Sequence, residues 1–140
     1  MADNLAQITQ KDLLDTCLHT SGSAAWTTPP SIWVGLCSAA PTDTATNELT
    51  VGGNYARKEI GFSAATTASP SASTGPVATC TWTSASTAWG AIAGYILCAA
   101  STGSTGASRY IAYGLTNPTV TVASNDIVEF AAAAISLSFS

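Results

Sequence analysis

The sequence predicts an all-β fold, namely an antiparallel β-sandwich of jelly-roll-like type with about eight strands and one short N-terminal helix. Side chains alternate in several short segments with the period of two that is typical of strands, most clearly over residues 32–37. Clusters of Gly, Pro, Asn, Asp and Ser separate these segments. The chain has 140 residues, the length of one domain, so we expect a single unit over residues 1–140.

Residues 1–22 are expected to form the helical segment. Apolar residues recur there at spacings of about three and four, which gives a helix one apolar face; they are Ile8, Leu13, Leu14, Cys17 and Leu18. Gly22 lies where a helix C-terminus is predicted. The helix either covers one end of the sandwich or reaches a neighbouring subunit, and we expect the first.

The sandwich is expected over residues 31–140, around a central strand at 32–37. A loop at 42–54 leads to a strand at 55–62, in which Tyr55 and Arg57 share one face and Ile60 takes the other. Residues 64–76 contain no aliphatic side chain larger than Ala, which predicts an exposed loop or arm.

The second half of the chain is predicted to add short strands separated by turns. Asn117 and Pro118 are expected to form a turn that ends one strand and starts the next. Asp43 and Asp126 are expected in turns where their side chains hydrogen-bond the local backbone. The predicted strands cover residues 77–83, 91–98, 109–115, 119–122, 127–130 and 134–139.

The composition is poor in charge. Only 9% of the residues are charged, whereas 26 are Ala, 21 Thr and 17 Ser. A surface of methyl and hydroxyl groups suits a subunit that neighbours cover in a large assembly, with an ordinary extracellular domain as the alternative. The net charge is −4 and the four basic residues are dispersed, which argues against nucleic-acid binding. No apolar run approaches the roughly 18 residues of a membrane helix, and no signal peptide is recognisable, so we expect synthesis in a cytoplasm.

The sequence contains no recognisable catalytic or metal-binding motif, and we expect no enzyme activity, cofactor or metal. His19 is the only histidine, and no Gly-x-Ser-x-Gly elbow or Cys-x-x-Cys pair occurs. Asp43 with Glu48 as a calcium site is less favoured than two ordinary turn residues. The strand cysteines are expected to be buried free thiols, with an inter-strand disulfide as the open alternative; they are Cys37, Cys80 and Cys98.

Several segments, in this order along the chain, resemble a family of small structural proteins of tailed bacteriophages that are often labelled tail-fibre proteins. The matching segments are Ile32–Leu36, Pro41–Thr44, Gly52–Arg57, Trp89–Gly90, Tyr95–Leu97, Ala112–Gly114 and Phe130–Ile135. Ala133 departs from the family pattern, which commonly has Gly there. The resemblance implies a virion component with no catalytic residues to carry over.

From this resemblance and the composition we expect a capsid decoration protein on the exterior of the virion, made in the cytoplasm of a host bacterium. The expected partners are the major capsid protein and further copies of the chain, as a homotrimer. The candidate contact residues are Leu13, Leu14, Asn47, Leu49, Tyr55 and Arg57. The alternative is a tail-fibre or head-fibre domain that binds host glycans through Trp26 and Trp89. A polysaccharide hydrolase is the third class.

Overall fold

The computed structural model is an all-β protein in which every described strand pairing is antiparallel, as predicted. It describes residues 4–5, 31–50, 53–63, 66–68, 71–74, 78–84, 86–102, 110–131, 134–135 and 137–139. Within these ranges there is no helix, and therefore none that could span a membrane.

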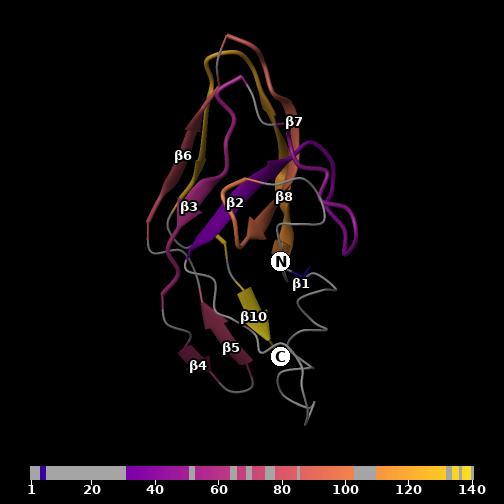
Figure 1. Ribbon diagram of the computed structural model, residues 1–140. Helices are drawn as coiled ribbons and strands as arrows, with labels where there is room; N and C mark the ends of the chain where they lie inside the picture. The colour runs from indigo at the N-terminus through magenta and orange to yellow at the C-terminus, as the bar shows by residue number, and fades with distance from the viewer. Residues whose placement is uncertain are drawn as a thin grey trace.

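The described strands form three sheets (Figure 1). The largest has the strand order β1-β8-β7-β2-β3, the second β10-β5-β4, and the third pairs β6 with β9. The strands are β1 (Asn4–Leu5), β2 (Ile32–Cys37), β3 (Lys58–Ile60), β4 (Thr66–Ala68), β5 (Ser71–Thr74), β6 (Cys80–Thr83), β7 (Gly90–Cys98), β8 (Tyr110–Val122), β9 (Ile127–Phe130) and β10 (Leu137–Phe139). The predicted number of about eight strands is not confirmed.

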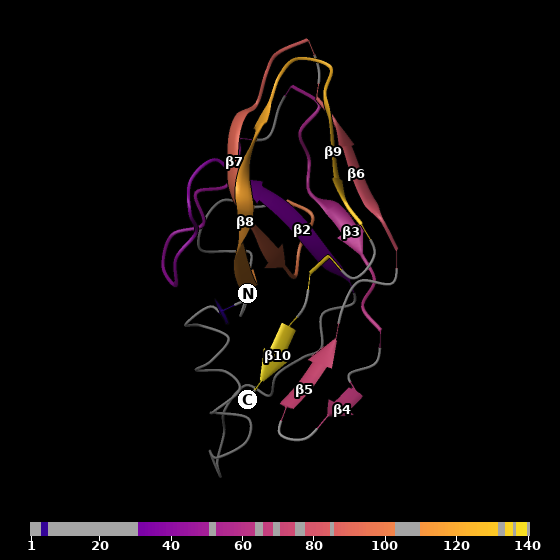
Figure 2. The same cartoon turned by 180° about the vertical axis from the view of Figure 1, so that it is seen from behind.

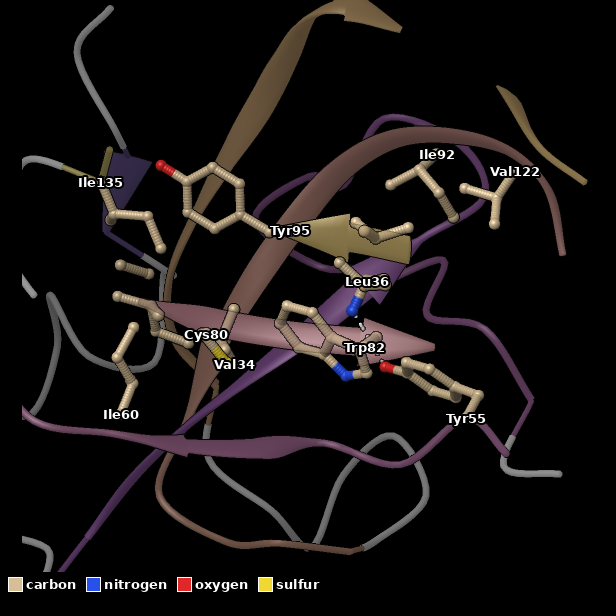
Figure 3. Packing of buried hydrophobic residues seen from close by; sticks show 13 residues of the cluster. Val34, Leu36, Tyr55, Ile60, Cys80, Trp82, Ile92, Tyr95, Val122 and Ile135 are labelled. Carbon is tan, nitrogen blue, oxygen red and sulfur yellow. Dashed lines mark hydrogen bonds between the residues drawn. The ribbon is translucent and has the colours of Figure 1, made fainter. Parts of the chain in front are cut away.

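The hydrophobic core lies between the five-stranded sheet and the β6–β9 pair. Trp82 of β6 is 1% exposed and packs among inward side chains such as Leu36 of β2 (Figure 3). Its indole N–H donates to the Ala56 carbonyl at 2.8 Å, and its ring meets Phe130 edge-on at a centroid distance of 5.8 Å. The polar atom of this large side chain is therefore satisfied inside the core.

Strand β8 continues through the predicted turn at Asn117 and Pro118, so that prediction is wrong. The pairs Gly94–Leu115 and Ile92–Val120 flank an irregularity in which residues 116–119 of β8 face the single residue Ala93 of β7. The Thr116 hydroxyl donates to the Ile92 carbonyl at 2.8 Å, which holds this bulge against β7. The Asn-Pro signal therefore marks a bulge within a strand.

Residues 64–76 were expected to be an exposed loop or arm, but the chain forms the strands β4 and β5 there, paired antiparallel. Strand β10 pairs with β5 and completes a small sheet beyond the end of the larger one (Figures 1 and 2). The prediction relied on the lack of large aliphatic side chains. Thr favours strands because it is β-branched, and the backbone hydrogen bonds with β10 stabilise β5 further.

The predicted N-terminal helix falls almost entirely outside the described residues. Only Asn4 and Leu5 are described, and they form β1, which pairs with Tyr113 and Ala112 of β8. Leu5 therefore belongs to a strand and not to a helix.

The packing of Trp82 gives a stability prediction. Trp82→Ala removes the central ring and leaves a cavity, so we expect the free energy of unfolding to fall by about 3–5 kcal/mol in urea titrations. Thr81→Ala, at the exposed neighbouring position, should change it by less than about 0.5 kcal/mol. Equal effects of the two substitutions would contradict this description of the core.

Candidate functional site

The five-stranded sheet has a second apolar face, on the side away from β6 and β9. Cys37, Ile96 and Cys98 are fully buried there, and partly buried aromatic residues pack against them. Residues 38–50, which we call the clamp loop, leave the end of β2 and lie over this face (Figures 1 and 2). The clamp loop is therefore part of the fold as well as part of the surface.

A buried ion pair fastens the returning half of the clamp loop. The Arg57 Nε donates to Glu48 Oε1 at 2.8 Å, and its Nη2 donates to Oε2 at 2.6 Å. The two side chains are only 4% and 13% exposed. A third guanidinium nitrogen, Nη1, donates to the Ala100 carbonyl at 2.9 Å, so Arg57 connects the loop to the segment after β7. This two-pronged geometry fixes orientation as well as charge.

Tyr55 links this ion pair to the end of strand β2. Its hydroxyl donates to Glu48 Oε1 at 2.8 Å. The same hydroxyl accepts the Leu36 N–H at 2.9 Å (Figure 3). Burial, followed by the neighbouring Glu48 carboxylate, raises the pKa of the Tyr55 hydroxyl above its ordinary value. The Leu49 N–H donates to the Leu36 carbonyl at 2.9 Å. The N–H and the carbonyl of Leu36 therefore both have hydrogen-bond partners in the segment between β2 and β3.

Two strand glycines provide the space that the clamp loop fills. A Cβ on Gly35 of β2 would lie 2.6 Å from Glu48 Oε1. A Cβ on Gly94 of β7 would lie 2.6 Å from Pro41 Cδ and equally close to the Gly114 carbonyl oxygen. A larger residue at Gly35 would therefore displace the Glu48 carboxylate, and one at Gly94 would displace Pro41 or the backbone of β8 at Gly114.

Residues 42–45, the tip of the clamp loop, are held from β8. The Tyr110 hydroxyl donates to the Thr42 carbonyl at 2.8 Å, and the Tyr113 hydroxyl donates to Asp43 Oδ1. Within the tip, the Ala45 N–H donates to Thr42 Oγ1 at 3.1 Å, and the Thr42 N–H donates to the Ala45 carbonyl at 2.8 Å. The side chains of all four tip residues are exposed to solvent.

The two aspartates expected in turns have different roles. Asp126 Oδ2 accepts the Ala123 N–H at 2.8 Å, as a turn aspartate should. Asp43 instead accepts from Tyr113, while Thr42 makes the local backbone bond. Among the described residues no group of three or more His, Cys, Asp or Glu side chains could hold a metal ion.

The three described cysteines are buried free thiols, which confirms the prediction for Cys37, Cys80 and Cys98. Burial raises the pKa of the Cys98 thiol to about 12, and Arg57 opposes this only partly. Burial, with a smaller effect of Glu48, raises the pKa of Cys37 still further above its ordinary value. Both thiols therefore stay protonated near neutral pH.

The structure places the predicted contact residues in different environments. Asn47 is exposed in the clamp loop, whereas Leu49 is half-buried against the core. Tyr55 and Arg57 are buried and hydrogen-bonded to Glu48, so they hold the clamp loop and are not exposed for contact with another protein. The remaining predicted residues, Leu13, Leu14 and Trp26, lie outside the described residues.

Trp89, a candidate for glycan binding, is half-buried and is used inside the chain. Its indole N–H donates to the Gly53 carbonyl at 3.1 Å, and its ring meets Tyr55 edge-on at a centroid distance of 5.7 Å.

Sequence reasoning missed Glu48 as the partner of Arg57. The signal in the sequence that could have indicated this pair was the rarity of charged residues, which make up only 9% of the chain.

The ion pair gives a stability prediction. Arg57→Met leaves the Glu48 carboxylate buried without its cation, so we expect the free energy of unfolding to fall by about 3 kcal/mol. Adding Glu48→Gln should restore more than half of the loss, because no uncompensated charge remains. Lys58→Met removes the same charge at an exposed neighbour and should have an effect below about 0.5 kcal/mol. Urea titrations measure all three, and a similar loss in Arg57→Met and Lys58→Met would refute the assignment.

The buried thiols give a prediction of pH dependence. In the unfolded chain Cys37 and Cys98 ionise around their ordinary value of 9.0, whereas in the folded chain they remain protonated. The folded state therefore binds more protons, and stability is lost as pH rises above about 9. Urea titrations between about pH 7 and about pH 10 should show a shallower decline in the Cys37→Ala/Cys98→Ala variant. Parallel declines in the two proteins would exclude the thiols as the cause.

Comparison with known proteins identifies the family. The segments that carried the sequence resemblance meet at the clamp loop, since they supply Gly35, Pro41, Asp43, Arg57 and Tyr113. A search of curated proteins finds no match. The model of the family described as Podophage GP4 fiber I protein gp80 matches residues 4–138. Because this match extends over nearly the whole chain, the protein belongs to that family, which is one of phage structural fibre proteins.

Proposed function

We propose that this chain is a non-enzymatic structural component of a phage particle and that it forms part of a fibre. The observation that carries the proposal is the family match, which spans residues 4–138 and therefore concerns the whole domain. The proposal explains why the chain is rich in Ala, Thr and Ser and poor in charge, because subunits of a particle are covered by neighbours.

The chemistry of the described residues supports a structural role. The most buried charged groups, Glu48 and Arg57, are engaged with each other and with Tyr55. The buried cysteines carry raised pKa values, which makes them poor nucleophiles. A rigid β-scaffold of this kind loses little conformational entropy when it docks into an assembly.

Capsid decoration is the second candidate. It is supported by the compact sheet structure and the low charge, which suit a domain that clamps adjoining shell subunits. In that case the partners are the major capsid protein and two further copies of the chain, on the exterior of the head. The contacts would include the loop at 42–54 and the hairpin of β4 and β5, and avidity would come from many copies.

A fibre can bind a host receptor, but the structure argues against the aromatic glycan platform that the sequence suggested. Trp89 already donates its indole N–H to Gly53 and packs its ring on Tyr55. A glycan platform needs two or three aromatic rings on one exposed face. We therefore propose assembly, and not glycan recognition, as the task of the described surface.

Copy number separates the two candidates. We expect the protein in particles purified by density gradient, at a handful of copies per particle by quantitative gel and mass spectrometry. Immunogold labelling should then lie at an appendage. Hundreds of copies with labelling over the head would instead support capsid decoration. Absence from purified particles would overturn the structural role altogether.

A further inference from the structure

The clamp loop is held by features that do not maximise stability. Gly35 and Gly94 lie inside strands, where glycine is less stable than almost any other residue. A buried ion pair such as Glu48 with Arg57 is also no more stable than well-packed apolar side chains of similar volume. A sheet face that only needed covering would be served better by larger strand residues under an apolar loop.

These features have one common effect, which is to fix the conformation of the clamp loop. The ion pair and Tyr55 hold its returning half, Gly94 receives Pro41 in its first half, and two tyrosine hydroxyls of β8 hold its tip. Asn47 adds a brace inside the loop, because its side-chain amide donates to the Ala40 carbonyl at 2.7 Å. Local choices that sacrifice stability are expected where a conformation serves function.

The tip presents a small, polar and acidic surface. Thr42, Asp43, Thr44 and Ala45 are all exposed, and none has a large apolar side chain. Asp43 gives the tip one negative charge, and its described interaction is with the neutral Tyr113 hydroxyl, not with a cation. Two copies that met at their tips would bring their Asp43 carboxylates together, and the net charge of −4 would not offset this, so the tip of a second copy is a poor electrostatic match.

We propose that the tip of the clamp loop, residues 42–45, is the surface through which this chain docks onto a different protein of the particle. The partner site is a shallow concavity lined by cationic hydrogen-bond donors, such as arginine or lysine side chains, that receive the Asp43 carboxylate and the threonine hydroxyls. Because the loop is already fixed in the free chain, docking orders little additional backbone. This inference rests on the proposed particle role and names the surface that performs it.

Complementation of a phage with the gene deleted tests this directly. Copies per purified particle are counted for the wild-type chain and for variants supplied from a plasmid. Ala45→Arg adds bulk and positive charge at the tip without removing a side-chain contact, since Ala45 bonds only through its backbone. We expect it to lower incorporation by about tenfold or more, as a central interface residue would. Ala88→Arg makes the same change at an exposed position remote from the tip and should leave incorporation unchanged.

A second variant tests the charge of the partner. Asp43→Asn keeps an acceptor for Tyr113 and removes the negative charge, so we expect incorporation to fall by about threefold to tenfold. Thermal unfolding of each purified variant should match the wild type. Incorporation of Ala45→Arg at the wild-type level, or an equal loss in Ala88→Arg, overturns the docking surface, and an unaffected Asp43→Asn overturns the cationic partner. Absence of the wild-type chain from particles would instead reject the proposed function.

Discussion

The contact between Glu48 and Arg57 is the constraint on which the position of the clamp loop over the sheet depends. It closes a loop that starts at the end of β2 and returns to the same strand, and it does so between two side chains that water barely reaches. The Tyr55 hydroxyl connects the pair to the backbone of Leu36, so the charged cluster and the strand end form one unit. Because each polar atom of this unit has a partner, the cluster is tolerated beside an apolar core.

The two faces of the five-stranded sheet therefore lie in different environments. Its inner face meets Trp82 and belongs to a conventional hydrophobic core, where the period-two pattern of β2 places Val34 and Leu36. Its outer face is covered by a polar loop seated in spaces left by Gly35 and Gly94. The same alternation thus assigns one set of residues to stability and the other to the positioning of a surface loop.

Much of the strand framework was predictable because alternation is a local property. The bounds of β2 and β9 agree with the predicted segments 32–37 and 127–130. What failed depended on partners outside the segment itself: β5 is paired with β10, and the buried position of Arg57 is explained by Glu48 in the preceding loop. The site was harder to predict than the fold, because Pro41 and Gly94 are brought together only by the pairing of β2 with β7.

The bulge at residues 116–119 has a consequence for how such a chain behaves at high concentration. In the described part of the chain, β8 pairs with β1 only at Tyr113 and Ala112, and its later residues form an outer strand rich in Thr and Val. A flat outer strand of that composition is a template for open-ended stacking into amyloid-like fibrils. The irregular backbone and the missing N–H of Pro118 break the hydrogen-bonding repeat that such growth requires. Copies of the chain can thus lie close together without this outer strand serving as a regular template for fibril growth.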